Sequence, residues 1–180
     1  MGNFRRAVFL DRDGIINEII FRNGKLSAPY SLTEFRFLPK VKEAIALFKR
    51  NGFLRIVVTN QPEIGRGDYS EKSLQEIHQL MNRKLDLNAV YFCPHDKDGG
   101  CSCKKPSIGL VEKAKSEFGI DLSRSFVVGD RWRDIELGKR SGCRTILVNT
   151  QATALDTKLV KPDYMVNNLL EAAHLTGGEI

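Results

Sequence analysis

Short apolar segments alternate with longer amphipathic segments along most of this chain. The apolar segments predict buried β-strands over residues 7–10, 54–59, 89–92, 125–129, 145–148 and 164–166. Between them, apolar residues spaced three and four positions apart predict helices over 40–50, 70–85, 107–118 and 132–141. Strands that alternate with helices in this way favour a mostly parallel sheet with helices on both faces. We therefore predict an α/β fold with three layers, of the Rossmann-like kind.

Three longer stretches between these elements are predicted to be irregular: residues 17–39, 62–69 and 93–106. Each of them follows a predicted strand end or the first turn beyond one. In an open α/β sheet, ligands bind at the carboxyl ends of the strands, where such loops lie. Because little sequence is left for an inserted domain, we expect no large cap domain over the site.

The length and composition limit the kind of protein. A chain of 180 residues, of which 42% are hydrophobic, can bury one core, so we expect a single domain over residues 1–180. No apolar run approaches the roughly 20 residues that cross a bilayer, so we expect no membrane partner. The N-terminal residues lead into a strand without a visible signal peptide, which predicts a cytoplasmic protein.

The formal net charge of +6 suits an anionic partner, either a phosphorylated metabolite or a nucleic acid. Lys and Arg are scattered along the chain, without a dense tract or the interleaved aromatic residues of single-strand binders. The charge alone does not choose between these two partners, but the scatter makes a nucleic-acid partner the less expected one, and we expect a monomer.

Two aspartates, Asp11 and Asp13, directly follow the first predicted strand, and Gly14 then allows a sharp turn. At this spacing both carboxylates can face one pocket. One carboxylate can attack phosphorus and form an acyl phosphate, while the other acts as acid and then as base. Two clustered negative charges also favour a divalent cation. The same pattern occurs in helix caps and turns, so it carries weight only together with further site residues.

Later parts of the predicted sheet carry residues that suit the same chemistry. Thr59 ends the second strand, and its hydroxyl can donate to a phosphoryl oxygen. Lys104 and Lys105 precede a predicted helix, where a lysine can neutralise phosphate and nucleophile together. Asp130 follows the fourth strand and would complete the oxygen ligands of Mg²⁺. Asp134 could hold a metal-bound water, or equally complement the helix dipole.

A compact group of possible metal ligands is formed by Cys93, His95, Cys101 and Cys103. In a reducing cytoplasm, such clustering indicates a metal rather than disulfides. Three thiolates and one imidazole make a closed tetrahedral set for zinc, which leaves no open position for water. We therefore predict a structural zinc ion in a loop at residues 93–103, which orders this loop and holds the neighbouring lysines in place.

Taken in order, these segments supply Asp-x-Asp, Thr, Lys and Gly-Asp-x-x-x-Asp. This order resembles the four motifs of the haloacid dehalogenase (HAD) superfamily of aspartyl-nucleophile phosphatases, over residues 7–134. More specific motifs resemble the D-glycero-D-manno-heptose 1,7-bisphosphate 7-phosphatase family, whose lineage the histidinol-phosphate phosphatases share. These motifs are Asp11-Arg-Asp13-Gly14-Ile-Ile-Asn17, Thr59-Asn60-Gln61, Arg66-Gly67, Cys93-Pro-His95, Cys101-x-Cys103-x-Lys105-Pro106 and Gly129-Asp130-Arg131.

The resemblance implies the HAD fold, a phosphatase activity and roles for individual residues. Asp11 would be the nucleophile and Asp13 the general acid and base. Thr59 and Lys105 would stabilise the transferring phosphoryl group. The catalytic Mg²⁺ would be held by the Asp11 carboxylate, the Asp13 backbone carbonyl and Asp130. Residues that match substrate-recognition positions are Asn17, Asn60, Gln61, Arg66, Lys104 and Arg131. The substrate would be a small phosphorylated sugar, and the reaction would belong to carbohydrate metabolism, for example lipopolysaccharide biosynthesis.

One departure from the family bears on the substrate. The family usually has Arg-Lys-Pro where this chain has Lys104-Lys105-Pro106. An arginine grips a phosphate with two hydrogen bonds, whereas a lysine offers a point charge, so the exact substrate and anomer stay open. A histidinol-phosphate phosphatase and a polynucleotide 3′-phosphatase remain as alternative enzymes. A zinc-organised binding module without activity is a third alternative, against which the complete set of acidic residues and Lys105 argues.

Overall fold

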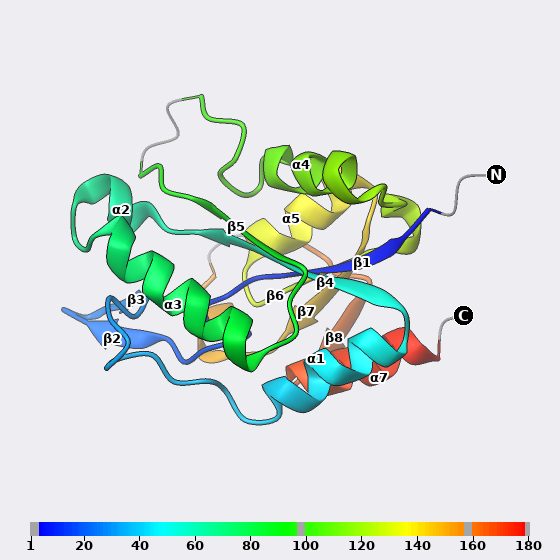
Figure 1. Cartoon of the computed structure of the whole chain (residues 1–180), viewed down its shortest axis with the longest axis horizontal. Coiled ribbons are helices and arrows are strands. Elements are labelled where there is room, and N and C mark those ends of the chain that lie inside the picture. Colours follow the sequence, from blue (N-terminus) through cyan, green and yellow to red (C-terminus); the bar gives the residue numbers. More distant parts are fainter. Residues whose placement is uncertain (1–3, 97–99, 157–159, 179–180) are drawn as a thin grey trace.

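The computed structural model describes residues 4–96, 100–156 and 160–178, and its centre is a six-stranded parallel sheet (Figure 1). The strand order is β5-β4-β1-β6-β7-β8, so β1 is paired on both sides. The strands span Arg6–Leu10 (β1), Phe53–Asn60 (β4), Ala89–Cys93 (β5), Phe126–Gly129 (β6), Arg144–Val148 (β7) and Tyr164–Val166 (β8). Each strand overlaps a segment predicted from the sequence, and the predicted parallel sheet is confirmed.

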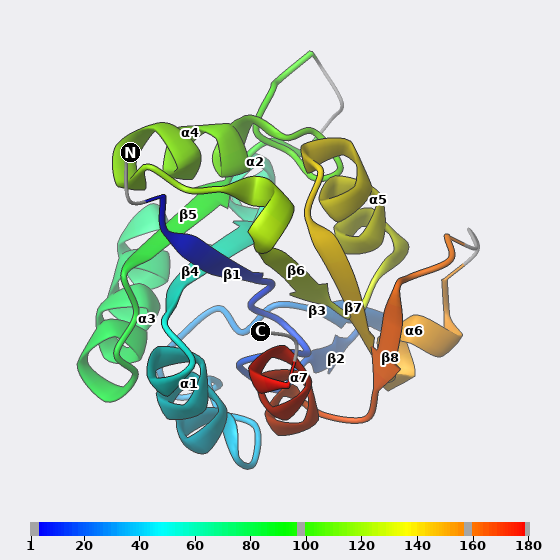
Figure 2. The ribbon, with the colours of Figure 1, turned by 90° about the vertical axis from the view of Figure 1, so that its right-hand side faces the viewer.

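Helices cover both faces of this sheet (Figure 2). One face carries α1 (Val41–Arg50), α3 (Glu71–Lys84) and α7 (Leu169–Gly177), and the other carries α4 (Gly109–Phe118) and α5 (Trp132–Ser141). Within β1, Val8 and Leu10 belong to one hydrophobic core, while Ala7 and Phe9 belong to the other. Both faces of β1 are therefore buried, which explains its continuous apolar sequence. The three-layer Rossmann-like fold is confirmed.

Three neighbouring strands end at the same edge of the sheet. Leu10 of β1 is in register with Val57 of β4 and Val128 of β6. The residues that follow these positions therefore lie close together, although they are far apart in the sequence. The short helix α2 (Pro62–Arg66) and the loop after β5 lie beyond the same edge, at the left of Figure 1.

An antiparallel hairpin also lies at this edge, within the stretch predicted to be irregular. Its strands are β2 (Ile20–Arg22) and β3 (Lys25–Ser27). The turn residues Asn23 and Gly24 have φ angles of 50° and 76°, and positive φ at both positions favours an Asn-Gly turn. Residues 17–39 and 62–69 were predicted to be irregular. This prediction was wrong where the first stretch forms the β2-β3 hairpin and where the second forms α2.

The remaining elements were not predicted from the sequence: the 3₁₀ helix η1 (Leu122–Arg124), the helix α6 (Gln151–Ala154) and α7. Asn168 caps α7, because its side chain accepts a hydrogen bond from the Glu171 backbone N–H at 3.0 Å. Over the residues that the structure describes, no large cap domain stands above the sheet, as expected. Among the same residues, no helix is both long enough and apolar enough to cross a membrane.

Candidate active site

Asp11 is the first residue beyond β1. Its backbone N–H donates to the Val128 carbonyl of β6 at 3.0 Å, which fixes the backbone at the strand end. The side-chain Oδ1 accepts from the Lys105 Nζ at 2.7 Å and from the Arg12 backbone N–H at 2.7 Å. Two donors therefore hold this carboxylate within the pocket that it lines.

Lys105 lies between two carboxylates. Its Nζ is 2.7 Å from Asp11 Oδ1 and 2.7 Å from Asp134 Oδ1, and its side chain is 4% exposed. Burial alone would lower the pKa of Lys105, but the two carboxylates raise it, so the amine stays protonated. The side chain of Asn60 holds the Lys105 backbone through two hydrogen bonds. A positive charge is thereby fixed beside Asp11.

Asp11, Asp130 and Asp134 each offer an oxygen that lies within 4.8 Å of the others. Burial and the neighbouring carboxylates raise the pKa of Asp11 to about 6 and the pKa of Asp130 to about 8. Oδ2 of Asp130 accepts from the Thr150 hydroxyl at 2.8 Å. Oδ1 of Asp130 is buried and has no hydrogen-bond partner among the described protein atoms. An acidic cluster with such an oxygen fits a hard cation such as Mg²⁺.

Two glycines allow these carboxylates to approach the backbone closely. Gly14 has a φ of +83°, and a Cβ there would lie 2.2 Å from Asp130 Oδ2. A Cβ on Gly129 would lie 2.2 Å from Asp134 Cγ. Neither position has room for a side chain, and Gly14 also needs the left-handed backbone that glycine tolerates. The sequence indicated a turn at Gly14 but could not show this close approach.

Asp13 lines the same pocket as Asp11, and three side chains hold its carboxylate. Oδ1 accepts from Arg12 Nη2 at 2.9 Å and from Asn17 Nδ2 at 2.9 Å. Oδ2 accepts from Gln61 Nε2 at 2.8 Å. Arg12, Asn17 and Gln61 are all fully buried, so they are held by packing as well as by hydrogen bonds. Buried side chains outside the pocket lining therefore set the orientation of the Asp13 carboxylate.

Thr59, near the end of β4, is fully buried and is not among the residues that line the pocket. Its Oγ1 accepts a hydrogen bond from Gln61 Nε2 at 2.9 Å. The hydroxyl hydrogen can therefore point to a different acceptor. Its contact with a phosphoryl group stays a prediction.

The pocket enclosed by these groups has a volume of about 330 Å³. Its lining includes the cationic side chains of Lys104, Arg131 and Arg133, and Leu26 and Ser27 of the β2-β3 hairpin. Cationic side chains in the lining suit an anionic substrate. Sequence reasoning did not single out Arg133, although it lies between Arg131 and Asp134 in the motif that follows β6.

The residues predicted to recognise substrate fall into separate groups. Lys104 and Arg131 line the pocket; Lys104 Nζ donates to the Asp96 carbonyl and Arg131 Nε donates to Asp156 at 2.7 Å. Asn60 also lines the pocket, with its amide bonded to the Lys105 backbone.

The other predicted substrate residues do not line the pocket. The amides of Asn17 and Gln61 are buried against Asp13. Arg66 pairs with Asp68 at 3.0 Å and with Asp96 at 2.6 Å. Direct contact of these three residues with a substrate stays a prediction, and in the structure each of them is bonded to another side chain of the protein.

Thr150, which caps α6, and Thr153 within α6 contact Asp130, and neither was found from the sequence. Thr150 Oγ1 donates to Asp130 Oδ2 at 2.8 Å, and Thr153 Oγ1 donates to the Asp130 carbonyl at 2.8 Å. Thr150 is close to the carboxyl end of β7, which is the next strand after β6 in the sheet. The rule that functional groups gather at strand ends would have indicated this position.

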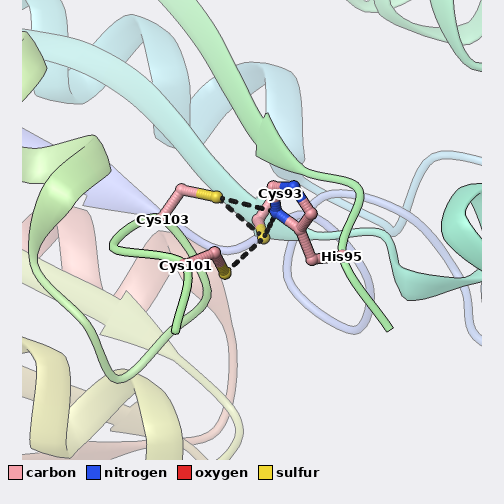
Figure 3. A group of neighbouring side chains, drawn as sticks. All are labelled: Cys93, His95, Cys101 and Cys103. Carbon is pink, nitrogen blue, oxygen red and sulfur yellow. Dashed lines mark hydrogen bonds between the residues drawn. The ribbon is translucent and has the colours of Figure 1, made fainter. Parts of the chain in front are cut away.

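The side chains of Cys93, His95, Cys101 and Cys103 point toward one another beside the carboxyl end of β5 (Figure 3). Their ligand atoms all lie within 4.8 Å of one another, so these residues could hold a metal ion. The Cys93 sulfur is 3.0 Å from that of Cys103 and 3.8 Å from that of Cys101. A tetrahedral zinc site with bonds of about 2.3 Å needs sulfurs about 3.8 Å apart. The Cys93–Cys101 pair has this spacing, and the Cys93–Cys103 pair is closer, so the donor set fits zinc after a small outward shift of one thiol. Within the predicted zinc loop, residues 97–99 lie outside the described part of the chain.

Comparison with known proteins supports one family. A family model described as "HAD-hyrolase-like" matches residues 102–172. The D-glycero-beta-D-manno-heptose-1,7-bisphosphate 7-phosphatase of Haemophilus ducreyi is 32% identical over 180 aligned positions, covering 93% of this chain and 96% of that protein. The chain belongs to the D-glycero-D-manno-heptose-1,7-bisphosphate 7-phosphatase family.

Another relative of this heptose-bisphosphate phosphatase family is named for the other anomer. It is the D-glycero-alpha-D-manno-heptose-1,7-bisphosphate 7-phosphatase of Photorhabdus laumondii, which is 34% identical and covers 81% of this chain and 83% of its own. Among solved structures, the D,D-heptose 1,7-bisphosphate phosphatase of B. bronchiseptica, complexed with magnesium and phosphate, has a TM-score of 0.85. It is 28% identical, and the match covers 97% of this chain and 99% of that one. The HAD fold of this family member is therefore shown by sequence and by structure.

Proposed function

We propose that this family member is a Mg²⁺-dependent phosphomonoester hydrolase that removes the 7-phosphate of D-glycero-D-manno-heptose 1,7-bisphosphate. The observation that carries the proposal is that Asp11 and Asp13 line one pocket, with Lys105 Nζ 2.7 Å from Asp11. A nucleophile, an acid-base group and a fixed cation are the parts that phosphoryl transfer through a covalent intermediate requires. The identity of the sugar in this proposal comes from the names of the relatives.

In the first step, a carboxylate oxygen of Asp11 attacks the phosphorus of the 7-phosphate. A bond from Asp11 to phosphorus forms while the bond from phosphorus to the sugar oxygen breaks. The protonated Asp13 gives its proton to the departing oxygen, which leaves as a hydroxyl. Lys105 and Thr59 stabilise the negative charge on the phosphoryl oxygens during this transfer.

In the second step, water attacks the phosphorus of the aspartyl phosphate. The Asp13 carboxylate takes one proton from this water, so the acid form of Asp13 is restored. The bond between phosphorus and Asp11 breaks, which releases inorganic phosphate and returns the Asp11 carboxylate. Asp13 is therefore used once as an acid and once as a base in each turnover.

Mg²⁺ would be held by the carboxylates of Asp11 and Asp130 and by the backbone carbonyl of Asp13, with Asp134 near a bound water. The buried Asp130 Oδ1 without a hydrogen-bond partner in the described chain supports this assignment. When bound, the ion neutralises phosphoryl oxygens that would otherwise repel the anionic nucleophile.

The second phosphate of such a substrate would lie against the cationic side chains of Lys104, Arg131 and Arg133. These three residues belong to the pocket lining and come from the loop before α4 and the start of α5. Lys104 offers a point charge where the family usually has the two-pronged guanidinium of arginine. Relatives are named for both anomers, so the experiment below includes both.

We also propose that zinc, bound by Cys93, His95, Cys101 and Cys103, has a structural role. Four protein ligands leave no open coordination position for a reacting water. The site directly precedes Lys104 and Lys105 in the chain. An ordered loop at this point would fix the approach of both lysines to the pocket.

The cellular setting is part of the proposal. The four cysteines carry free thiols in the structure, which suits the reducing cytoplasm. We propose that the chain acts there as a monomer with a single domain. A sugar phosphatase of this kind would serve carbohydrate synthesis, such as that of lipopolysaccharide.

A substrate panel tests the proposed function. It contains both anomers of the heptose bisphosphate, histidinol phosphate and a 3′-phosphorylated oligonucleotide. We expect kcat/KM for one heptose anomer to exceed that for histidinol phosphate and for the oligonucleotide by at least about tenfold, a difference of about 1.4 kcal/mol. A higher kcat/KM for either of the other two substrates would replace the proposed substrate.

The covalent route is tested with Asp11→Asn, which removes the attacking carboxylate and should abolish turnover. Asp86→Asn is the matched control, because Asp86 pairs with Lys49 and does not line the pocket. The control should retain the wild-type rate. Appreciable turnover by folded Asp11→Asn protein would rule out Asp11 as the nucleophile.

A further inference from the structure

Arg12, between the two aspartates, is fully buried. Its Nη2 donates to Asp13 Oδ1 at 2.9 Å and to Gln61 Oε1 at 2.9 Å. A buried cation needs a counter-ion, and Asp13 fills this role in its ionised form, the form in which it acts as the base of the second step. Because a guanidinium has donors only, each of these contacts must end on an acceptor oxygen. Arg12 thus joins Gln61 and Asp13 in one hydrogen-bonded unit.

The amide of Gln61 has only one acceptable orientation in this unit. Its Oε1 must face Arg12, which leaves Nε2 to donate to Asp13 Oδ2 at 2.8 Å and to Thr59 Oγ1 at 2.9 Å. A flipped amide would set its own hydrogens against the guanidinium donors. Gln61 therefore presents a fixed donor to Asp13.

Tyr69 holds the same amide from another side. Its hydroxyl donates to Gln61 Oε1 at 2.6 Å. Burial raises the pKa of Tyr69, so the hydroxyl keeps its proton and remains a donor. The ring is fixed as well, because it stacks on Tyr30 with centroids 4.7 Å apart and planes at 10°. The Tyr30 hydroxyl accepts from Ser27, a residue of β3 that lines the pocket.

We propose that Tyr69, through the Gln61 amide, is a positioning residue that holds Asp13 in the orientation from which it protonates the leaving oxygen. The inference rests on the proposed function, because it takes Asp13 as the general acid. In the step concerned, the O–H bond of Asp13 breaks and the proton passes to the sugar oxygen as its bond to phosphorus breaks. Tyr69 is not part of the pocket lining, so it acts on this step through Gln61. Without its hydroxyl, Arg12 alone holds Gln61 Oε1. The amide keeps its orientation but is held less tightly, so the hydrogen bond that it donates to Asp13 Oδ2 is less well fixed.

Two substrates with different leaving groups test this role. A sugar alkoxide needs the proton of Asp13, whereas the acetate released from acetyl phosphate is stable without one. For Tyr69→Phe, we expect the ratio of kcat/KM for heptose bisphosphate to kcat/KM for acetyl phosphate to fall about tenfold. This fall is part of the roughly 10²- to 10⁴-fold rate acceleration that a positioned general acid contributes. A merely structural loss would lower both values together and leave the ratio unchanged.

Tyr91→Phe is the matched control. The Tyr91 hydroxyl also makes a 2.6 Å hydrogen bond, to Glu117, and Tyr91 does not line the pocket. The Tyr91→Phe variant should keep the wild-type ratio of the two kcat/KM values. Thermal unfolding checks that each variant is folded. Gln61→Leu is a second variant of similar volume, which removes the donor to Asp13 without adding a charge beside it and should lower the ratio further.

The outcomes separate the two proposals. A ratio within about twofold of wild type in both folded variants, in an active enzyme, would overturn the positioning role alone. Wild-type protein that hydrolyses neither phosphate compound would overturn the proposed function, and the positioning role with it. A ratio that falls in Tyr69→Phe but not in Tyr91→Phe supports the inference.

Discussion

The side-chain amide of Asn60 pairs with the backbone of Lys105 through two hydrogen bonds. Asn60 Nδ2 donates to the Lys105 carbonyl at 3.2 Å, and the Lys105 N–H donates to Asn60 Oδ1 at 2.9 Å. The end of β4 is thereby joined to the loop after β5, and the Lys105 amine is aimed at Asp11. The sequence suggested that Asn60 binds substrate, whereas these contacts show that it holds the backbone of Lys105, the lysine that we propose to be catalytic.

Asn60→Ala distinguishes these two roles. If Asn60 positions Lys105, its loss should lower kcat by about 10- to 100-fold, because a small displacement of a catalytic group is costly. If it binds substrate in the ground state, KM should rise while kcat is kept. Steady-state kinetics separate the two. Asn88→Ala is the control, because the Asn88 side chain also holds a backbone N–H, that of Arg55, away from the pocket.

The second prediction concerns the close approach of Gly14 to Asp130. Gly14→Ala would place a Cβ 2.2 Å from Asp130 Oδ2 at a φ of +83°. We expect Mg²⁺ binding, measured by calorimetry, to weaken at least about tenfold, and activity to fall with it. Gly24→Ala is the control: its φ is +76°, but a Cβ there meets nothing within 4 Å. Both variants carry a backbone strain of about 1–2 kcal/mol, so only the clash differs. Equal Mg²⁺ affinity in the two variants would contradict the assignment of Asp130 as a metal ligand.

The third prediction concerns zinc. We expect one zinc ion per wild-type chain by atomic emission and none in Cys101→Ser. Without the ion, the loop that carries Lys104 and Lys105 should loosen, and kcat/KM should fall about tenfold or more. Cys143→Ser is the control, because Cys143 is packed in the hydrophobic core among residues of α4 and α5. Zinc-free, folded Cys101→Ser with wild-type kcat/KM would separate the metal from catalysis.

The six strands of the sheet could be predicted because their signal is local. The segment from Ala7 to Leu10 is apolar at each position, since both faces of β1 are buried. The hairpin was missed because its strands are three residues long and contain no fully buried residue, so their pattern is weak. Its only clear signal was the pair Asn23-Gly24, which favours a tight turn.

The site residues likewise divide into those that could be predicted from the sequence and those that could not. Asp11 and Asp130 were found because each directly follows an apolar strand, and parallel strands bring their carboxyl ends together. The link from Arg12 through Gln61 to Tyr69 was not found. Arg12 and Gln61 follow the ends of the neighbouring strands β1 and β4, but the strand-end rule does not say which side chains pair there. Tertiary packing decides which donor meets which acceptor. Arg12 occupies the variable position between the two motif aspartates, so the motif does not indicate its hydrogen-bond partners.

The fourth prediction concerns stability and pH. His78 on α3 is 8% exposed, and its Nε2 is buried without a hydrogen-bond partner in the described part of the chain. Burial lowers the pKa of His78 to about 3 in the folded protein, against about 6.5 in an unfolded chain. Between these values the unfolded state binds the extra proton. The contribution of His78 to stability is therefore complete above about pH 6.5 and declines as the pH falls toward 3.

His78→Leu removes this contribution and should make the protein less sensitive to acid. From pH 7 to pH 5.5, the wild-type free energy of unfolding should fall by about 1.3 kcal/mol more than that of His78→Leu, as linkage requires for one histidine. Urea unfolding at the two pH values measures the difference. His174→Gln, at an exposed position of α7, is the control and should follow the wild type. If wild type and His78→Leu lose the same free energy over this range, His78 is protonated in the folded state and its burial does not exclude the charge.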